Sequence, residues 1–226
     1  ASLGDQGLPV AGALARELDL IEADIPWHVA RDGVAEVACW LGVLCGSLSK
    51  IGTDVMLLMQ TELAEVAEPH MPKRGGSSTM PQKRNPIACE YILAQARGVH
   101  ALVPQMLSAM AHDLERGTGP WQAEALALPQ AFLLTHGAVA QARFLAEGLQ
   151  VDAARMQANL EATHGMIMGE AVMMRLAPIL GRGEAHHKVN DACDAVRAEG
   201  ITLAAALSRI PAIAARLDTA AVEAMT

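Results

Sequence analysis

The chain has 226 residues, and its 17 Lys and Arg against 25 Asp and Glu give a formal net charge of −8. This acidic balance argues against nucleic acid as a partner, because phosphate binding needs a basic face. Hydrophobic residues make up 52% of the chain but aromatic residues only 3%. Such a composition predicts an all-α protein, since strands favour β-branched and aromatic residues.

The four cysteines, Cys39, Cys45, Cys89 and Cys193, form no CxxC pair and have no zinc-site spacing. We interpret them as buried thiols in the reducing cytoplasm. The first residues, ASLGDQG, lack the basic and apolar regions of a signal peptide. No apolar stretch reaches the ~20 residues that span a bilayer. The sequence therefore predicts a cytoplasmic protein without a membrane partner.

Residues 1–25 are predicted to begin as a loop and to become weakly helical. From residue 34 the apolar residues recur in alternating steps of three and four. They are Val34, Val37, Leu41, Leu44, Leu48, Ile51, Val55 and Leu58. This heptad seam, with no proline from 27 to 68, predicts one long helix over about residues 28–65 that belongs to a helix bundle.

Two further long helices are expected. Asn85 is a favoured N-cap and Pro86 a favoured first helical residue, so the second helix is predicted to begin there. Pro104 is predicted to kink this helix without ending it, because the apolar spacing resumes at Met106. A third helix is predicted over residues 121–149.

After Gly148 the predicted segments are short, and each is closed by Gly or Pro. They cover residues 152–163, 166–180, 184–199, 202–210 and 213 onward. Asp152 and Thr202 are expected N-caps. The expected C-terminal stops are Gly165, Gly181 and Gly200.

The change in segment length predicts a domain boundary near residue 150. A central helical-bundle domain is expected over residues 1–149 and includes an unusual loop over residues 70–85. A small C-terminal helical domain is expected over residues 150–226.

This loop lies in the segment HMPKRGGSSTMPQKRNPIAC, residues 70–89, which contains four basic residues and no Asp or Glu. The basic residues are Lys73, Arg74, Lys83 and Arg84. The first amides of the helix that follows lack intrahelical partners and carry partial positive charge, which favours a bound anion. Lys83 adds a full charge and Asn85 an amide group. The expected ligand is a carboxylate or a phosphate.

Gly75 and Gly76 give the loop conformational freedom, and Ser77 and Ser78 follow them directly. A serine hydroxyl is a poor base unless nearby amides or cations stabilise its oxyanion, and this loop offers both. By itself, Gly-Gly-Ser-Ser is more often a flexible linker, and the spacing of a P-loop is absent. The combination predicts a mobile loop that delivers a serine to a bound carboxylate.

Residues 76–86, GSSTMPQKRNP, resemble the GSSxMPxKxN signature of the fumarase/aspartase superfamily at every fixed position. The resemblance extends over essentially the whole chain. It implies a long-helix bundle with a small C-terminal helical domain, and a homotetramer in which three subunits form each active site. It also implies a small polycarboxylate substrate, a bond made or broken β to a carboxylate, and neither metal nor organic cofactor.

The resemblance assigns roles by position. Ser77 occupies the place of the catalytic base, and Lys83 and Asn85 occupy those of ligands for substrate carboxylates. Glu90 falls where the family has a glutamate that pairs with a catalytic histidine from an upstream motif. That motif and a second signature region are not visible here, so the chain is expected to be a fragment without a complete active site.

Other substrate-binding residues follow from the same resemblance. Ser78, Thr79 and Met80 lie on the loop that closes over substrate. Arg116, in a loop where the family places ligands, is a candidate for a substrate carboxylate, with a surface or interhelical ion pair as the alternative. The adjacent residues His186 and His187 point to different helix faces, so we predict no metal site there.

Four stretches most resemble a subgroup of bacterial cycloisomerases that act in the degradation of aromatic compounds. In their reaction a carboxylate of a muconate adds to a double bond of the same molecule. The four stretches are ASLGDQGLPVAGALARELDL, PWHVARDGVAEVACWLG, STMPQKRNPIACE and LERGTGPWQAEALALP. Adenylosuccinate lyases have a similar loop, but the chain shows no second basic cluster for a nucleotide phosphate, and argininosuccinate lyases are a weaker match. A non-catalytic helical assembly module is the alternative from another class.

Overall fold

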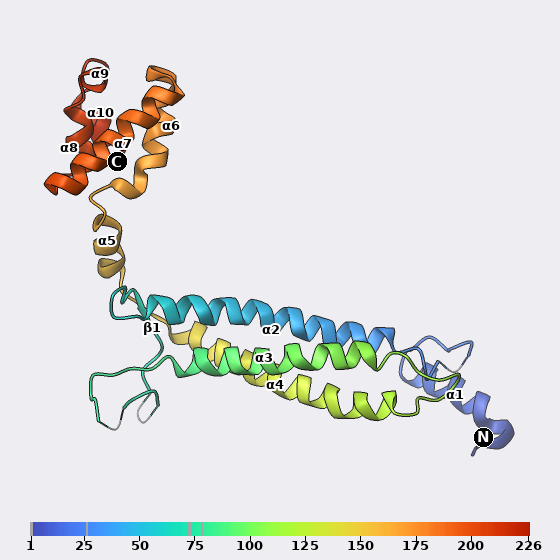
Figure 1. Ribbon diagram of the computed structural model, residues 1–226. Helices are drawn as coiled ribbons and strands as arrows, with labels where there is room; N and C mark the ends of the chain where they lie inside the picture. Colours follow the sequence, from blue (N-terminus) through green and yellow to red (C-terminus); the bar gives the residue numbers. More distant parts are fainter. Residues whose placement is uncertain (1, 26, 72–73, 78) are drawn as a thin grey trace. The chain divides into compact units, whose positions relative to one another are not determined.

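The structure, a computed structural model, describes residues 2–25, 27–71, 74–77 and 79–226 (Figure 1). The chain divides into two compact units. One unit combines residues 1–53 with 87–144, and the other combines residues 54–86 with 145–226. The boundary expected near residue 150 stays a prediction. Helices dominate both units, which confirms the all-α class.

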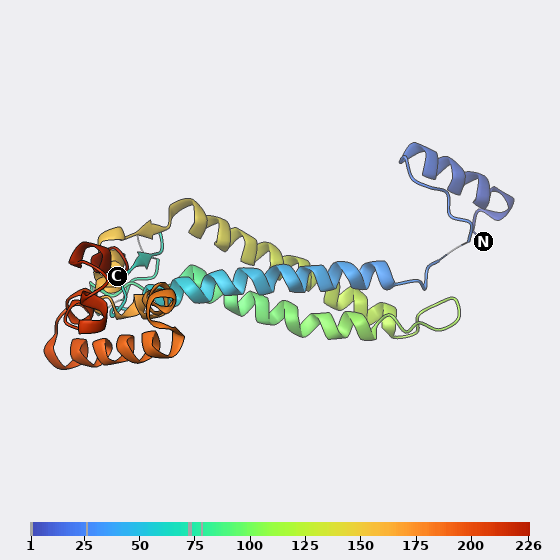
Figure 2. The same cartoon turned by 90° about the horizontal axis from the view of Figure 1, so that it is seen from above.

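The first unit is built on three long helices that run side by side, and the last residues of two of them, 54–58 and 145–148, are assigned to the second unit (Figure 2). They are α2 (Asp32–Leu58), α3 (Ile87–Ser108) and α4 (Pro120–Gly148), with α1 (Gly7–Glu17) and a short 3₁₀ turn (Gly4–Gln6) before them. Part of their shared core consists of Leu41, Cys45, Ala96, Val99, Ala131 and Ala138. The helix bundle was therefore predicted correctly. The loop expected near the N-terminus was wrong, because Gly7 already begins a helix and Pro9 is tolerated in its first turn.

The predicted helix ends need correction. α2 covers residues 32–58 instead of 28–65, because the chain turns at residues 59–65. α3 begins at Ile87, one residue after the expected start. Pro104 lies inside α3, as predicted, and the helix continues to Ser108.

The buried face of α2 differs from the predicted seam. Val37 and Ile51 are 41% and 50% exposed, whereas Ala35, Ala38 and Cys45 are buried. At Gly52 an added Cβ would lie 2.7 Å from Leu93 Cδ1 on α3. Small residues thus form the contact because they let the two helices approach closely, and several large apolar residues stay on the outer surface.

Among the described helices, α2 is long and apolar enough to cross a membrane by length and composition alone, a test that core helices of soluble proteins also pass. Charged residues, including Glu36 and Lys50, interrupt its apolar sequence. For this reason the sequence by itself showed no continuous apolar span.

The second unit contains a two-stranded sheet that the sequence did not predict. β1 (Val66–Ala67) pairs antiparallel with β2 (Gln150–Val151), with Val66 opposite Val151 and Ala67 opposite Gln150. Through this pairing, the segment that precedes the loop 70–85 lies beside the chain entering the C-terminal helices. The pairing was missed because two-residue strands carry no alternating pattern.

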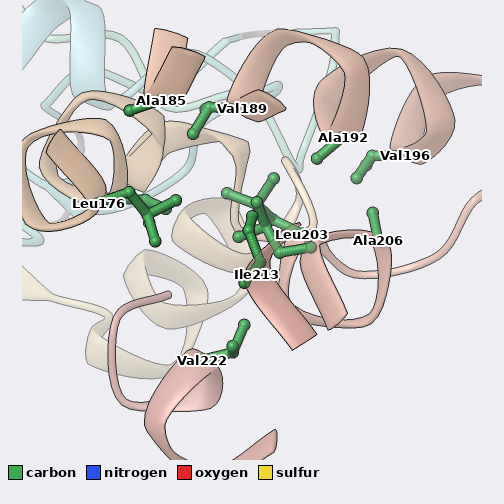
Figure 3. Packing of buried hydrophobic residues seen from close by; sticks show 11 residues of the cluster. Leu176, Ala185, Val189, Ala192, Val196, Leu203, Ala206, Ile213 and Val222 are labelled. Atoms are coloured by element: carbon green, nitrogen blue, oxygen red, sulfur yellow. The ribbon is translucent and has the colours of Figure 1, made fainter. Parts of the chain in front are cut away.

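Short helices complete the second unit. They are α5 (Ala153–Glu161), a 3₁₀ turn (Met166–Met168), α6 (Gly169–Leu180), α7 (Arg182–Glu199), α8 (Leu203–Ser208), α9 (Pro211–Ala214) and α10 (Thr219–Glu223). Figure 3 shows Leu176, Val189, Leu203, Ile213 and Val222 among the side chains that form one core here. All five are at most 7% exposed.

The predicted N-caps of this region and the stops at Gly181 and Gly200 are confirmed. The stop predicted at Gly165 was wrong, because α5 already ends at Glu161 and Gly165 precedes the 3₁₀ turn. Asp152 Oδ1 accepts a hydrogen bond from the Arg155 N–H at 2.9 Å, and Thr202 Oγ1 accepts one from the Ala205 N–H at 3.2 Å. Gly200 ends α7 with φ of +68°, a left-handed conformation that favours glycine.

Candidate active site

The loop 70–85 is closed at its base by main-chain contacts. The Asn85 N–H donates to the Gly75 carbonyl oxygen at 2.8 Å, and Gly76 and Arg84 form an isolated antiparallel bridge. Gly75 has φ of +72°, a left-handed conformation that favours glycine. The loop therefore has a defined hairpin base. Of the two adjacent glycines, Gly75 is the one whose backbone conformation favours glycine.

Ser77 lies beyond this base and is half-buried. Its Oγ accepts hydrogen bonds from the main-chain N–H groups of Thr79 at 3.3 Å and Met80 at 3.1 Å. Thr79 Oγ1 is 3.4 Å away from the same oxygen. Donors aimed at one hydroxyl oxygen favour its negatively charged form. Ser78 lies outside the described residues.

A cleft of about 360 Å³ lies against the base of the loop. Its lining residues are Met59, Glu68, Pro69, His70, Arg74, Gly75, Gly76, Pro81, Gln82, Lys83, Arg84 and Asn85. The volume is within the range of small-molecule sites. Lys83 and Asn85 thus lie together as expected, whereas Ser77, Thr79 and Met80 are not part of this lining.

The charges around the cleft are mostly positive. Arg74, Lys83 and Arg84 contribute three cations, and the carboxylate comes from Glu68, which is 6% exposed. A surplus of cations in a small cleft favours a ligand with carboxylate groups. Met80 is 47% exposed and Thr79 is exposed, so both are accessible on the loop.

Arg84 connects the loop to the short sheet. Its Nη2 donates to the Glu68 carbonyl oxygen at 3.2 Å, and its Nη1 donates to Gln150 Oε1 on β2 at 3.4 Å. The sequence indicated Arg84 only as a positive charge. The contact could not be predicted because it depends on the unpredicted pairing of β1 with β2.

Glu90 and Arg116 belong to the first unit and are both exposed. Glu90 is in the first turn of α3, and Arg116 lies in the connection that follows the other end of this helix. The helical rise of 1.5 Å per residue places Glu90 about 27 Å from Ser108 at the end of α3. One copy of this unit therefore does not bring both side chains to one small ligand.

The loop that carries Arg116 is supported by aromatic and ionic contacts that the sequence did not indicate. The His28 ring packs edge-on against Trp121 with ring centroids 5.4 Å apart, and its centroid is 6.5 Å from that of His112. A Cβ added to Gly117 would lie 2.7 Å from the His112 ring. Only a glycine next to Arg116 permits this close packing.

An ion pair lies near these contacts. Arg31 donates from Nε to Glu124 Oε2 at 2.9 Å, and its Nη2 contacts Glu124 Oε1. The hydrogen bond to Glu124 raises the pKa of Arg31, against the opposing effect of burial. The pair joins the start of α2 to α4.

A family model described as "Lyase" matches residues 9–100, which include the whole loop 70–85. The curated 3-carboxy-cis,cis-muconate cycloisomerase of Pseudomonas putida is 46% identical over 218 residues, covering 96% of this chain and 52% of that protein. The crystal structure of 3-carboxy-cis,cis-muconate lactonizing enzyme from Pseudomonas putida matches with a TM-score of 0.86 at 42% identity, covering all of this chain and 49% of that one.

The chain belongs to the fumarase/aspartase superfamily. The superfamily members that are similar to this chain carry the names of different enzymes. Trans-aconitate decarboxylase 1 of Mycosarcoma maydis is 45% identical to this chain. The aligned region covers 99% of this chain and 45% of that protein. The chain spans about half the length of the curated relatives that it matches.

Membership in the superfamily confirms the resemblance carried by residues 76–86. The roles of individual residues stay predictions. Among the described residues, no group of three or more His, Cys, Asp or Glu side chains could hold a metal ion. None of the four cysteines, all within the described residues, forms a disulfide. Cys45 and Cys89 are buried as predicted, whereas Cys39 and Cys193 are only half-buried.

Proposed function

We propose that the protein containing this chain is a 3-carboxy-cis,cis-muconate cycloisomerase. It would convert 3-carboxy-cis,cis-muconate to 4-carboxymuconolactone in the protocatechuate branch of the β-ketoadipate pathway. The observation that carries the proposal is the Ser77 hydroxyl, which accepts two main-chain hydrogen bonds on the same loop that places Lys83 and Asn85 in a cationic cleft. Several relatives with this name are 46–50% identical over most of the chain.

The reaction is an intramolecular addition in which no atoms are lost. A carboxylate oxygen of the substrate forms a bond to one carbon of a double bond, and a proton is added to the carbon beside a second carboxylate. In the reverse direction Ser77 removes that proton. The N–H groups of Thr79 and Met80 would stabilise the serine oxyanion that performs this step.

The cleft would hold the charge that develops on the substrate. When the proton leaves, the neighbouring carboxylate takes on enolate-like charge, which Lys83 stabilises together with the loop amides. Asn85 would donate from its side-chain amide to a substrate carboxylate. Because lactonisation releases no second product, the site has to fold the diene until the reacting atoms meet.

We also propose a homotetramer with active sites formed by different subunits. Trp40 and Val43 on α2 are 60% and 71% exposed, and Leu126 and Leu133 on α4 are 65% and 71% exposed. Large exposed apolar patches of this kind mark association surfaces. Glu90 lies near the start of α3 and Arg116 lies after its end, which supports the same proposal. Glu90 of one subunit and Arg116 of another could then contact the same substrate.

In this proposal Ser77 and Glu90 are catalytic, and Ser78, Thr79, Met80, Lys83, Asn85 and Arg116 bind the substrate. The enzyme would be cytoplasmic and would use neither metal nor organic cofactor. It would have no nucleic-acid or membrane partner. The acidic net charge of −8 supports the exclusion of nucleic acid.

Two alternatives follow from the same loop. An adenylosuccinate lyase-type enzyme would use Ser77 and Lys83 to release fumarate by β-elimination. A non-catalytic relative would keep the helical assembly alone. Such a relative has no need for Ser77, Lys83 and Asn85, yet all three are present.

A substrate panel tests the proposal. The protein containing this chain is incubated with 3-carboxy-cis,cis-muconate, adenylosuccinate or trans-aconitate, and the products are identified by chromatography and mass spectrometry. The proposal predicts 4-carboxymuconolactone of unchanged mass from the first compound and neither fumarate nor carbon dioxide from the other two. Fumarate from adenylosuccinate would favour the lyase, and inactivity on all three would favour the assembly module.

A further inference from the structure

Helix α5 donates hydrogen bonds to the turn that precedes the loop 70–85. This turn, residues 59–65, follows α2 and leads directly into β1. Arg155 Nε donates to the Leu63 carbonyl oxygen at 2.8 Å, and its Nη2 donates to the Glu62 carbonyl oxygen at 2.7 Å. A guanidinium group thus binds two successive carbonyl groups of the turn, which fixes their orientation as well as their position.

Asn159, one helical turn after Arg155, binds the same segment. Its Nδ2 donates to the Leu63 carbonyl oxygen and to Glu65 Oε1, both at 2.8 Å. Just before the helix, the Asp152 N–H donates to the Glu65 carbonyl oxygen at 2.9 Å. The start of α5 therefore supplies donors to the carbonyl groups of residues 62, 63 and 65.

The turn needs this support because its backbone is strained. Ala64 has φ of +52°, in the left-handed region that disfavours residues with a Cβ. Such a conformation persists where surrounding contacts determine it. Inside the turn, the Ala64 N–H donates to the Gln60 carbonyl oxygen at 2.7 Å, and the Glu65 N–H donates to the Leu58 carbonyl oxygen at 3.0 Å.

The turn is connected to both arms of the loop. Its first arm continues from β1 through Glu68, and the carbonyl oxygen of Glu68 accepts a hydrogen bond from Arg84 on the second arm at 3.2 Å. The contacts from Arg155 and Asn159 thus reach the base of the loop through one short segment. Neither residue lines the described cleft.

We propose that Arg155 and Asn159 are positioning residues that fix the loop 70–85 through the turn at residues 59–65. They touch neither Ser77 nor Lys83 in the described contacts, so they act by limiting the conformations of the segment that carries both. The consequence for catalysis rests on the proposed cycloisomerase function. The consequence for loop order does not.

Hydrogen exchange measured by mass spectrometry tests the structural part on the chain itself. The variants are Arg155→Met and Asn159→Ala. We expect exchange in peptides covering residues 59–69 and 70–86 to become about tenfold to a hundredfold faster, because each lost charge-assisted contact makes local opening easier. Amides within α7 should keep their rates.

A matched control is Arg175→Met. Arg175 Nη1 also donates to a main-chain carbonyl oxygen, that of Ala224 at 2.8 Å, but it has no described contact with the turn. This variant should leave the exchange of residues 59–86 unchanged. Equal acceleration in the control, or unchanged exchange in both test variants, would overturn the proposal. If Arg155→Met does not fold, Arg155→Lys replaces it and is expected to have an intermediate effect, since lysine lacks the planar fork that binds two carbonyl groups.

The catalytic part uses the protein containing this chain with 3-carboxy-cis,cis-muconate. We expect kcat to fall at least about tenfold in Arg155→Met, with partial rescue in Arg155→Lys. A substitution far from the reacting atoms can reduce the rate when it moves the catalytic groups out of position. Normal exchange and normal kcat in both test variants would refute the positioning role while the function stands. Faster exchange in a protein that does not act on this substrate would refute the function while the structural role stands.

Discussion

The hydroxyl oxygen of Ser77 accepts a hydrogen bond from the main-chain N–H of Met80 at 3.1 Å. The Thr79 N–H contributes a second donor at 3.3 Å. In the proposed reaction, in which Ser77 acts as the base, these two donors would stabilise negative charge on its oxygen.

Lys83→Met should reduce the stabilisation of the transition state more than the stability of the folded chain. Lys83 is exposed at the cleft, so its loss should leave the free energy of unfolding within about 0.5 kcal/mol of that of the unmodified chain. In the proposed reaction Lys83 stabilises an enolate-like oxygen, so removing its charge should reduce kcat/KM by about 10²–10³. Steady-state kinetics of the protein containing this chain measure the effect. Lys188→Met, which removes a lysine on α7, is the control, and an equal loss in both variants would contradict the assignment.

Gly75→Ala should disturb the base of the loop, whereas Gly76→Ala should not. Gly75 has φ of +72°, where an alanine costs about 1 kcal/mol or more. Gly76 lacks this constraint, and an added Cβ there meets no atom within 4 Å. Hydrogen exchange of the Asn85 amide, which donates to Gly75, measures the difference. Equal exchange in the two variants would show that the hairpin base does not depend on Gly75.

Mixed tetramers test whether different subunits form each active site. Ser77→Ala and Arg116→Met should each be nearly inactive when purified alone. If the two residues of one site come from different subunits, unfolding the variants together and refolding them should restore part of the activity, because some sites then contain neither substitution. Variants refolded separately and mixed afterwards are the control. Absence of any recovery in co-refolded samples would argue for sites within single subunits.

The ion pair between Arg31 and Glu124 should stabilise the first unit measurably. Their side chains are only 20% and 9% exposed, so breaking the pair by Arg31→Met should cost about 1–3 kcal/mol. A double-mutant cycle with Glu124→Gln, followed by urea unfolding, measures the coupling. Arg197→Met is the control, because the pair with Asp194 is 62% and 64% exposed and should contribute little.

The pH dependence of the same pair has a definite sign. Pairing raises the pKa of Arg31 in the folded chain. Its contribution is therefore fully present below the pKa of the unfolded chain and is lost only as the pH rises through the folded pKa. From the Arg31 guanidinium we expect no change of stability between pH 6 and pH 9. A coupling that disappeared within that interval would contradict the protonation state of Arg31.

The sequence predicted the long helices because they depend on local patterns. The chemistry expected of the loop also depends on a local pattern and stays a prediction. Heptad spacing identified α2, and Asp152 and Thr202 marked the starts of α5 and α8. The buried face of α2 could not be predicted, because large residues such as Val37 fit the heptad while the close contact with α3 selected small residues such as Gly52.

The contacts of Arg155 with the turn before the loop could not be predicted from the sequence either. Arg155 lies 92 residues after Leu63, and no pattern links a guanidinium to a carbonyl group at that separation. The pairing of β1 with β2 is equally long-range and only two residues deep. Local motifs thus predict which residues carry the chemistry, whereas the contacts that join the loop segment to α5 and β2 are long-range.

The most direct test is the turnover of 3-carboxy-cis,cis-muconate by the protein containing this chain and by its Ser77→Ala variant, followed by ultraviolet absorbance. We expect rapid turnover in the unmodified protein and a kcat lower by about 10³ or more in the variant, with substrate affinity largely kept. A variant kcat within about tenfold of the unmodified value would show that Ser77 is not the base.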